Sequence, residues 1–397
     1  MPLSKVAIQN VHSLMNKNID KRSRMHCPHS AFFVAWSVKK EKSLILSNYK
    51  MLYNMLTGRR RTKFMRYIDM HCDTLSLGLV EQRETITKLT NSMVDIERLE
   101  QCGAAAQFFA MFLPQRNMPQ WFGLTEMPEL YVLLQKMYDI FKETLKENEN
   151  RMAFAQSYEE MQENLQKGKM SAFLTIENAC VVNGKMENLK KFHEMGVGLM
   201  TLTWNDANCF GQNHSNEVSL MQKGLTTFGK EAILYMNELG IVIDVSHLSD
   251  GGFYDVAKIS KSPFVASHSN CRSLSPSTRN LTDDMIRLLA EKGGVAGINF
   301  EPTFLNANQK DTYSRVSCMC DHIEHFIKVG GVECVGIGTD FDGIGGQFEI
   351  SDCRKMQLLF DELHRRGVGD DTMEKIAFSN VARVIKDSMK ASTNVIF

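Results

Sequence analysis

Five side chains of the types that bind metal ions stand where apolar runs of this sequence end. His71 and Asp73 lie two residues apart in YIDMHCDT, so on a strand both would point to the same side. Glu177 ends the apolar run SAFLTIE, and a carboxylate buried there is costly unless it is paired or binds a cation. His247 and His268 end IVIDVSH and FVASH in the same manner. Each residue alone has an ordinary structural explanation, but the joint pattern predicts a metal site.

Imidazoles and carboxylates together are ligands that suit zinc. Five ligands are too many for one tetrahedral catalytic ion, because such an ion must also keep a position for water. Two ions that share a bridging carboxylate would use all five. We therefore predict two Zn²⁺ ions per chain, with His71 and Asp73 on one, His247 and His268 on the other, and Glu177 between them.

These side chains can meet only if the chain brings the ends of its strands to one edge. Eight strand-like runs alternate with helical patterns after residue 66, and no Gly-x-Gly-x-x-Gly turn of a doubly wound sheet follows the first run. The predicted strands are 67–74, 104–113, 170–177, 198–204, 241–247, 264–269, 295–300 and 334–340. The helical patterns are 127–148, 186–195, 227–239, 251–260, 282–292, 314–329, 353–366 and a pair over 370–388. We predict a (β/α)₈ TIM-type barrel, whose strand ends form one rim.

The order and spacing of several segments resemble the membrane dipeptidase family, also called renal dipeptidase, in its bacterial cytoplasmic branch. The resemblance covers roughly residues 65–390. The segments that carry it are IDMHCDT, VDIERLEQCGAAAQFFAMF, FLTIEN, LMTLTWNDAN, IDVSHLSD, PFVASHSNCRSLSPSTRNLTDDMI and VGIGTDFDGI. The resemblance implies a barrel of the metal-dependent amidohydrolase kind, two zinc ions on the five ligands above, and hydrolysis of dipeptides through a hydroxide that bridges the metals. It also implies that a homodimer is possible.

Two further residues receive roles from the resemblance. Asp340 ends the last predicted strand and matches the family's general acid/base, with Asp342 as the competing choice. Arg279 matches the arginine that binds the substrate carboxylate, a task for which a bidentate guanidinium is well suited. The alternative for Arg279 is a surface ion pair with Asp283 or Asp284.

The segment at the fourth predicted strand departs from the family pattern. Better-studied members read Leu-Thr-His there, and that imidazole contacts the substrate near the developing oxyanion, whereas this chain reads Leu-Thr-Trp-Asn. We expect Trp204 and Asn205 to contact the substrate. Asn205, Asp206 or Asn208 would take over polarisation, and the substrate preference can differ from that of the family.

Charge is distributed unevenly along the 397 residues although the net charge is zero. Residues 1–64 contain 13 Lys and Arg against 2 Asp and Glu, so the rest of the chain is acidic and has no reason to bind nucleic acid. We predict that 1–64 is a basic, poorly ordered N-terminal extension without a role in the active site. Residues 65–397 would form the dipeptidase domain with its C-terminal helices.

The ten cysteines are scattered, several of them inside apolar runs, which is typical of free thiols in a reducing compartment. No apolar run approaches the ~18–20 residues that span a bilayer. We expect a cytoplasmic protein without a membrane segment.

Two other functions remain open at this point. One is another amidohydrolase-type activity on the same barrel, such as a lactamase or an amide hydrolase, since fold alone does not separate these. The other is a catalytically inactive barrel used for binding, against which the full ligand set and Asp340 argue.

Overall fold

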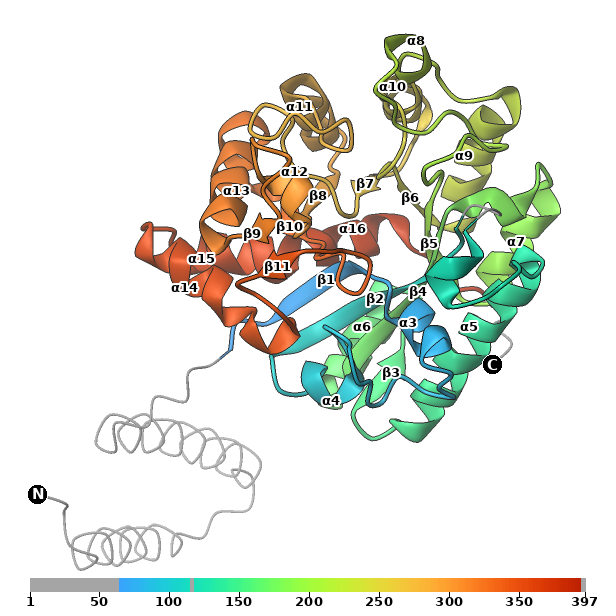
Figure 1. The fold of residues 1–397 in the computed structure, drawn as a ribbon, viewed down its shortest axis with the longest axis horizontal. Helices are drawn as coiled ribbons and strands as arrows, with labels where there is room; N and C mark the ends of the chain where they lie inside the picture. Colours follow the sequence, from blue (N-terminus) through green and yellow to red (C-terminus); the bar gives the residue numbers. More distant parts are fainter. Residues whose placement is uncertain (1–63, 115–117, 394–397) are drawn as a thin grey trace, which may run out of the picture. The chain divides into compact units, whose positions relative to one another are not determined.

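The structure, a computed structural model, describes residues 64–114 and 118–393. The predicted extension over 1–64 therefore lies outside the described residues, except for its last position. From residue 67 onward, strands and helices alternate around a closed ring (Figure 1).

Eight parallel strands form the ring, and each pairs with its two neighbours. β1 closes it by pairing with β2 on one side and with β10 on the other, where Asp69 faces Ile337. The strands are β1 (Tyr67–Cys72), β2 (Ala104–Phe112), β4 (Met170–Glu177), β5 (Val197–Thr201), β6 (Val242–Asp244), β7 (Val265–Ala266), β8 (Val295–Ile298) and β10 (Val335–Ile337). The predicted (β/α)₈ TIM-type barrel is confirmed.

Helices follow the strands and surround the barrel (Figure 1). They are α3 (Thr74–Val80), α4 (Ile96–Leu99), α5 (Leu130–Glu147), α6 (Tyr158–Gln166), α7 (Met186–Glu194), α8 (Val218–Met221), α9 (Thr227–Leu239), α10 (Asp250–Ile259), α11 (Asp283–Glu291), α12 (Pro302–Leu305), α13 (Val316–Gly330), α14 (Gln357–Arg365), α15 (Asp370–Glu374) and α16 (Asn380–Ser388). Local capping fixes several boundaries. The hydroxyl of Thr282 accepts a hydrogen bond from the Met285 amide at the start of α11, and Gly240 ends α9 in the left-handed conformation.

Two apolar layers hold the barrel together. The larger layer lies between the strands and the surrounding helices. The smaller layer contains Phe108 and Phe173, whose rings stack 4.6 Å apart, together with residues near the beginnings of several strands and with Val381 and Ile385 of α16. Because α16 packs on these residues, it covers the end of the barrel where the strands begin, and the polar ligands are left for the opposite end.

The structure adds elements that the sequence patterns did not reveal. A short strand, β3 (Met152–Phe154), pairs with the start of β4, and α6 follows it. Two more short strands, β9 (Tyr313–Ser314) and β11 (Gln347–Phe348), pair with each other beside the barrel. The predicted strands 241–247 and 264–269 are longer than β6 and β7, because their polar last residues leave the ladder and turn toward the barrel mouth.

No helix within 64–114 or 118–393 is long and apolar enough to cross a bilayer. The cysteines of these same ranges are all free thiols, as the sequence predicted.

Candidate metal centre

The predicted ligands and the predicted acid/base all lie at the carboxyl ends of barrel strands. They are His71 in β1, Asp73 directly after it, Glu177 at the end of β4, His247 after β6, His268 after β7 and Asp340 after β10. All six are buried, with at most 8% of their surface exposed. Strands separated by long stretches of sequence thus bring six potential ligand or proton-transfer groups to one rim of the barrel.

Glu177 lies at the centre of this group and its two carboxylate oxygens face different partners. Oε2 lies 3.4 Å from Nε2 of His71. Oε1 lies 3.1 Å from Nε2 of His247 and 3.7 Å from Nε2 of His268. This division has the form expected of a carboxylate that bridges two cations.

A second group of carboxylates surrounds His71. Its Nε2 lies 3.6 Å from Oδ2 of Asp73 and 3.7 Å from Oδ1 of Asp340. Gly343 makes the approach of these two acids possible, since a Cβ at this position would lie 2.1 Å from Oδ2 of Asp73 and 2.8 Å from Oδ1 of Asp340. His71 therefore belongs to two sets of side chains whose spacing could hold a metal ion, one with Glu177 and His268, the other with Asp73 and Asp340.

Several buried atoms of this cluster have no hydrogen-bond partner among the described residues. They are both ring nitrogens of His71, Oδ1 of Asp73 and Nε2 of His268. Buried polar atoms in native proteins are almost always paired, so the unpaired Nε2 atoms of His71 and His268, which both lie near Glu177, indicate a missing partner. Imidazole nitrogens and carboxylate oxygens are donors that a divalent cation requires, and the site therefore fits the predicted metal.

Electrostatics also favour cations at this position. Burial, with the negative charge of Asp73 in addition, raises the pKa of Glu177 to about 7. Burial likewise raises the pKa of Asp340 well above its usual value. Burial would lower the pKa of His71, but Glu177 and Asp73 outweigh it and hold that pKa well above the usual range. Gathering this many acidic groups out of water is unfavourable, and bound cations would relieve the cost.

Hydrogen bonds fix the ring orientation of two histidines. The hydroxyl of Ser267 donates to Asp244 at 2.6 Å, so it can accept from Nδ1 of His268, which lies 2.7 Å away. His268 then carries its proton on Nδ1 and leaves the lone pair of Nε2 directed into the site. Nδ1 of His247 lies 3.2 Å from Oδ1 of Asn205, which orients that ring in the same way. Such supporting groups are usual around metal-binding histidines.

Two site residues have strained backbones. His247 and Asp340 adopt left-handed conformations, with φ of 67° and 62°. For residues other than glycine this costs about 1–3 kcal/mol each, and it persists where the surrounding structure imposes it. Here it lets the chain turn at the strand end and direct the side chain inward. Asn299 then holds the Asp340 carboxylate by donating to Oδ2 at 2.8 Å.

The competing acid, Asp342, is used for another purpose. Its carboxylate accepts hydrogen bonds from the hydroxyls of Thr74 and Ser92, at 2.6 and 2.9 Å, and from the amide of Met93 at 2.6 Å. It therefore joins the loop after β10 to the segments after β1. These contacts favour Asp340 over Asp342 as the acid that faces the site.

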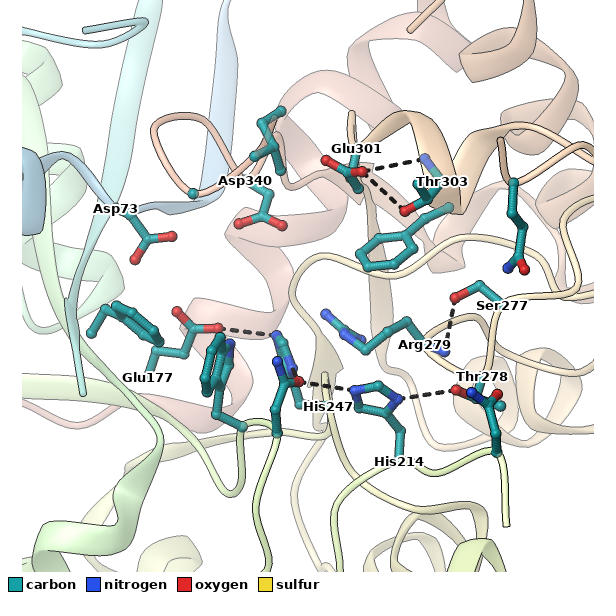
Figure 2. A pocket seen from close by; sticks show the side chains of 18 of the residues that line it. Asp73, Glu177, His214, His247, Ser277, Thr278, Arg279, Glu301, Thr303 and Asp340 are labelled. Carbon is teal, nitrogen blue, oxygen red and sulfur yellow. Dashed lines mark hydrogen bonds and ion pairs between the residues drawn. The ribbon is translucent and has the colours of Figure 1, made fainter. Parts of the chain in front are cut away.

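A pocket of about 470 Å³ opens onto the predicted metal ligands, and Arg279 lines it together with Glu177 and Asp340 (Figure 2). Arg279 is buried, its Nε has no hydrogen-bond partner among the described residues, and its Nη atoms make only long contacts, of 3.5 Å to Ser269 and 3.4 Å to the carbonyl of His268. Its guanidinium lies over the ring of Phe304, 5.2 Å from the centroid. A buried guanidinium with unused donors in a pocket fits the recognition of an anionic ligand group.

The alternative for Arg279, a surface ion pair, is wrong. Asp283 instead contacts Nε2 of His325 at 2.8 Å, and Asp284 pairs with Arg287 at 2.5 Å. Burial lowers the pKa of Arg279 to about 10, although the acids of the site oppose the change, and Arg279 stays charged near neutral pH.

The segment after β5 also reaches the pocket. Trp204 lies against Phe112, with ring centroids 4.9 Å apart, and both line the pocket wall. Asn205 lines it too, with its Oδ1 close to His247 and 2.9 Å from Nε2 of His214. Substrate contact by Trp204 or Asn205 stays a prediction.

Sequence reasoning missed His214. It lies in the irregular segment between β5 and α8, lines the pocket, and contacts Asn205 and Thr278 (Figure 2). Burial, with the charges of Arg279 and Arg272 in addition, lowers its pKa to about 3. The only signal was a histidine in a long connection that begins at a strand end bearing other site residues.

Comparison with known proteins gives a consistent result. The family model of the membrane dipeptidases (peptidase family M19) matches residues 59–395. An uncharacterised dipeptidase of Schizosaccharomyces pombe is 28% identical over 361 residues, which are 88% of this chain and 84% of that protein. Among solved structures, the metallopeptidase dipeptidase AC is 26% identical with a TM-score of 0.74, and covers 82% of this chain and 98% of its own. A metallopeptidase of Rhodobacter sphaeroides, solved with a phosphinate mimic of the dipeptide L-Ala-D-Ala, is 25% identical with a TM-score of 0.74, and covers 82% of this chain and 99% of its own.

Proposed function

Because the chain belongs to the membrane dipeptidase family and is a metal-dependent dipeptidase, we propose that it hydrolyses dipeptides at a centre of two zinc ions. His71 and Asp73 would hold one ion, His247 and His268 the other, and Glu177 would bridge them. The observation that carries this proposal is the division of the Glu177 oxygens between His71 on one side and His247 and His268 on the other.

When bound, the two ions would polarise the scissile carbonyl and lower the pKa of a water molecule. The remaining step belongs to a side chain of the protein. Oδ1 of Asp340 would accept a proton from the water and deliver it to the amide nitrogen as the peptide bond breaks. The hydrogen bond from Asn299 to the other oxygen keeps Oδ1 directed toward the centre.

Arg279 would bind the free C-terminal carboxylate of the dipeptide. Its unused donors, and the absence of an acidic side chain paired with it in the part of the chain that the structure describes, support this role. Trp204 and Phe112 would form an apolar wall for a substrate side chain, and Asn205 would contact the substrate or act through His247.

Replacing Arg279 with alanine should lower kcat/KM for dipeptides by about 100-fold, mainly through KM, because a charge-assisted bidentate contact is lost. Steady-state kinetics on dipeptides and on the same peptides with amidated C-termini would measure this. The amidated peptides should be affected far less, and equal losses on both would refute the role. Arg287→Ala, which removes an exposed arginine paired with Asp284, is the control and should behave as the unmodified protein.

Metal analysis of the purified protein after exposure to excess zinc and dialysis should give two equivalents of zinc per chain. The reason is that five ligand side chains, three of which have buried atoms without a hydrogen-bond partner among the described residues, exceed the needs of one tetrahedral ion. One equivalent would remove the bridging role of Glu177.

A panel of dipeptides, including D-residues at the second position, assayed with and without a chelator, tests the proposed activity. Hydrolysis that the chelator abolishes and zinc restores is the expected result. The L-Ala-D-Ala mimic bound by the Rhodobacter sphaeroides relative makes this dipeptide the first choice for the panel. If the panel is inert while a lactam or a simple amide is hydrolysed, the alternative activity on the same barrel is correct.

We further propose a cytoplasmic location, which is supported by free thiols throughout the described residues, since thiols stay reduced in that compartment. A homodimer is proposed from the family resemblance alone. Size-exclusion chromatography with light scattering would test it.

A further inference from the structure

His214 connects two parts of the pocket that come from different barrel segments. Its Nε2 lies 2.9 Å from Oδ1 of Asn205, and its Nδ1 lies 3.0 Å from the hydroxyl of Thr278 (Figure 2). Its backbone amide donates to the carbonyl of His247 at 2.8 Å. The imidazole is therefore held at both nitrogens, and its main chain is joined to a predicted metal ligand.

The direction of each hydrogen bond follows from the acceptor. Oδ1 of Asn205 can only accept, so Nε2 of His214 donates to it. Because a neutral imidazole has one donor and one acceptor, Nδ1 must then accept from the Thr278 hydroxyl. The same Asn205 oxygen lies 3.2 Å from Nδ1 of His247 and accepts from that ring as well. This leaves Nε2 of His247, 3.1 Å from Glu177, with its lone pair available for a cation.

On its other side, His214 is connected through Thr278 to the segment that carries the guanidinium of Arg279. Thr278 directly precedes Arg279, whose side chain makes only long hydrogen bonds and rests on Phe304. The place of Arg279 in the pocket therefore depends on where its backbone is held, and the hydroxyl of Thr278 is one point at which the loop is attached.

We propose that His214 is a positioning residue that fixes the separation between Arg279 and the metal ligand His247, and thereby selects substrates whose carboxylate lies one residue beyond the scissile bond. It acts through Asn205 on one side and Thr278 on the other, and it does not itself contact the reacting atoms. This inference rests on the proposed dipeptidase function and adds that His214 sets the length of substrate that the pocket accepts.

Three variants test the proposal: His214→Phe, Thr278→Val and the double variant. The measurements are the dissociation constant of a phosphinate dipeptide mimic, by calorimetry on the zinc-loaded protein, together with KM and kcat. Each single variant should weaken binding of the mimic by about tenfold and raise KM similarly, because each breaks the buried connection from Asn205 through His214 to Thr278. The double variant should be no weaker than the worse single variant, because both remove the same connection. Zinc content should be unchanged, and kcat should change by less than about threefold, since Asp340 is untouched.

Two controls separate positioning from general damage. Thr278→Ser keeps the hydroxyl and should restore the affinity that Thr278→Val loses. His325→Phe removes another imidazole with two contacts, to Ser273 and Asp283, outside the pocket, and should leave both binding and kinetics unchanged.

The proposal is overturned if Thr278→Val or His214→Phe binds the mimic as tightly as the unmodified protein. It also fails if their effects add in the double variant, or if a mimic with an amidated C-terminus is weakened equally. Failure of the proposed function has a different signature, in which the unmodified protein hydrolyses no dipeptide. The binding measurements would still decide the role of His214 in that case.

Discussion

Replacing Asp340 with asparagine should lower kcat by about 10³-fold, within the usual range for loss of a general acid/base, while the protein keeps its zinc. Asparagine retains the shape of the side chain and an oxygen that can accept from Asn299, but it cannot accept and release the proton. The carboxylate of Asp340 lies beside His71 but is not one of the five predicted ligands, so the metal content should change little. Steady-state kinetics and metal analysis on the same preparation would measure both effects.

Asp342→Asn is the matched comparison, since the two acids are two residues apart in one loop and both are left-handed. Asp342 accepts from Thr74, Ser92 and Met93, and its loss should lower the melting temperature while kcat falls by less than about tenfold. If Asp340→Asn retained full kcat, or if Asp342→Asn showed the larger kinetic loss, the assignment of the proton-transfer group would be wrong.

Replacing Glu177 with glutamine should reduce bound zinc to one equivalent or less and lower kcat/KM by at least about 10³-fold, because the bridge between the ions is lost. A neutral carboxamide removes the negative charge, and only one of its terminal atoms can act as an acceptor. The carboxamide could then act as a ligand on the side of His71 or on the side of His247 and His268, but not on both. Metal analysis after dialysis and kinetics at saturating zinc would give the two numbers.

Glu177→Asp sharpens this experiment. Aspartate keeps the charge but is one methylene shorter, so we expect it to hold one ion more firmly than glutamine does and still to lose most activity. Two equivalents of zinc bound to Glu177→Gln with unchanged affinity would show that the carboxylate does not bridge.

The sequence was sufficient to predict the barrel and the convergence of the predicted ligands on one rim. His71, Glu177 and His247 follow apolar runs, and in a parallel barrel the ends of such runs meet regardless of their distance along the chain. Strand β3 was not predicted because Met152–Phe154 is only three residues long, which is too short to show a hydrophobic period. The predicted strands around His247 and His268 were too long, since the polar residues that follow β6 and β7 have already left the sheet, and the sequence pattern did not mark where the strand ladder ends.

Contacts made by single side chains could not be predicted in the same way. The choice between Asp340 and Asp342 depends on which carboxylate Thr74 and Ser92 reach, and these residues lie more than 200 positions away. His214 was missed because an irregular segment carries no periodic pattern that orients its side chains. The separation of Arg279 from Asp283 and Asp284 likewise follows only from the folded structure, because their proximity in the sequence suggested that they pair.

Gly343 contributes empty space where the neighbouring residues contribute chemical groups. Any side chain there would strike Asp73 and Asp340 together and drive the two acids apart. A saturation screen of this loop should therefore find a position at which even alanine eliminates activity, although the wild-type residue has no side chain that could bind, donate or accept. The space left at this one position sets how closely the ends of two neighbouring strands, β1 and β10, can bring their carboxylates together.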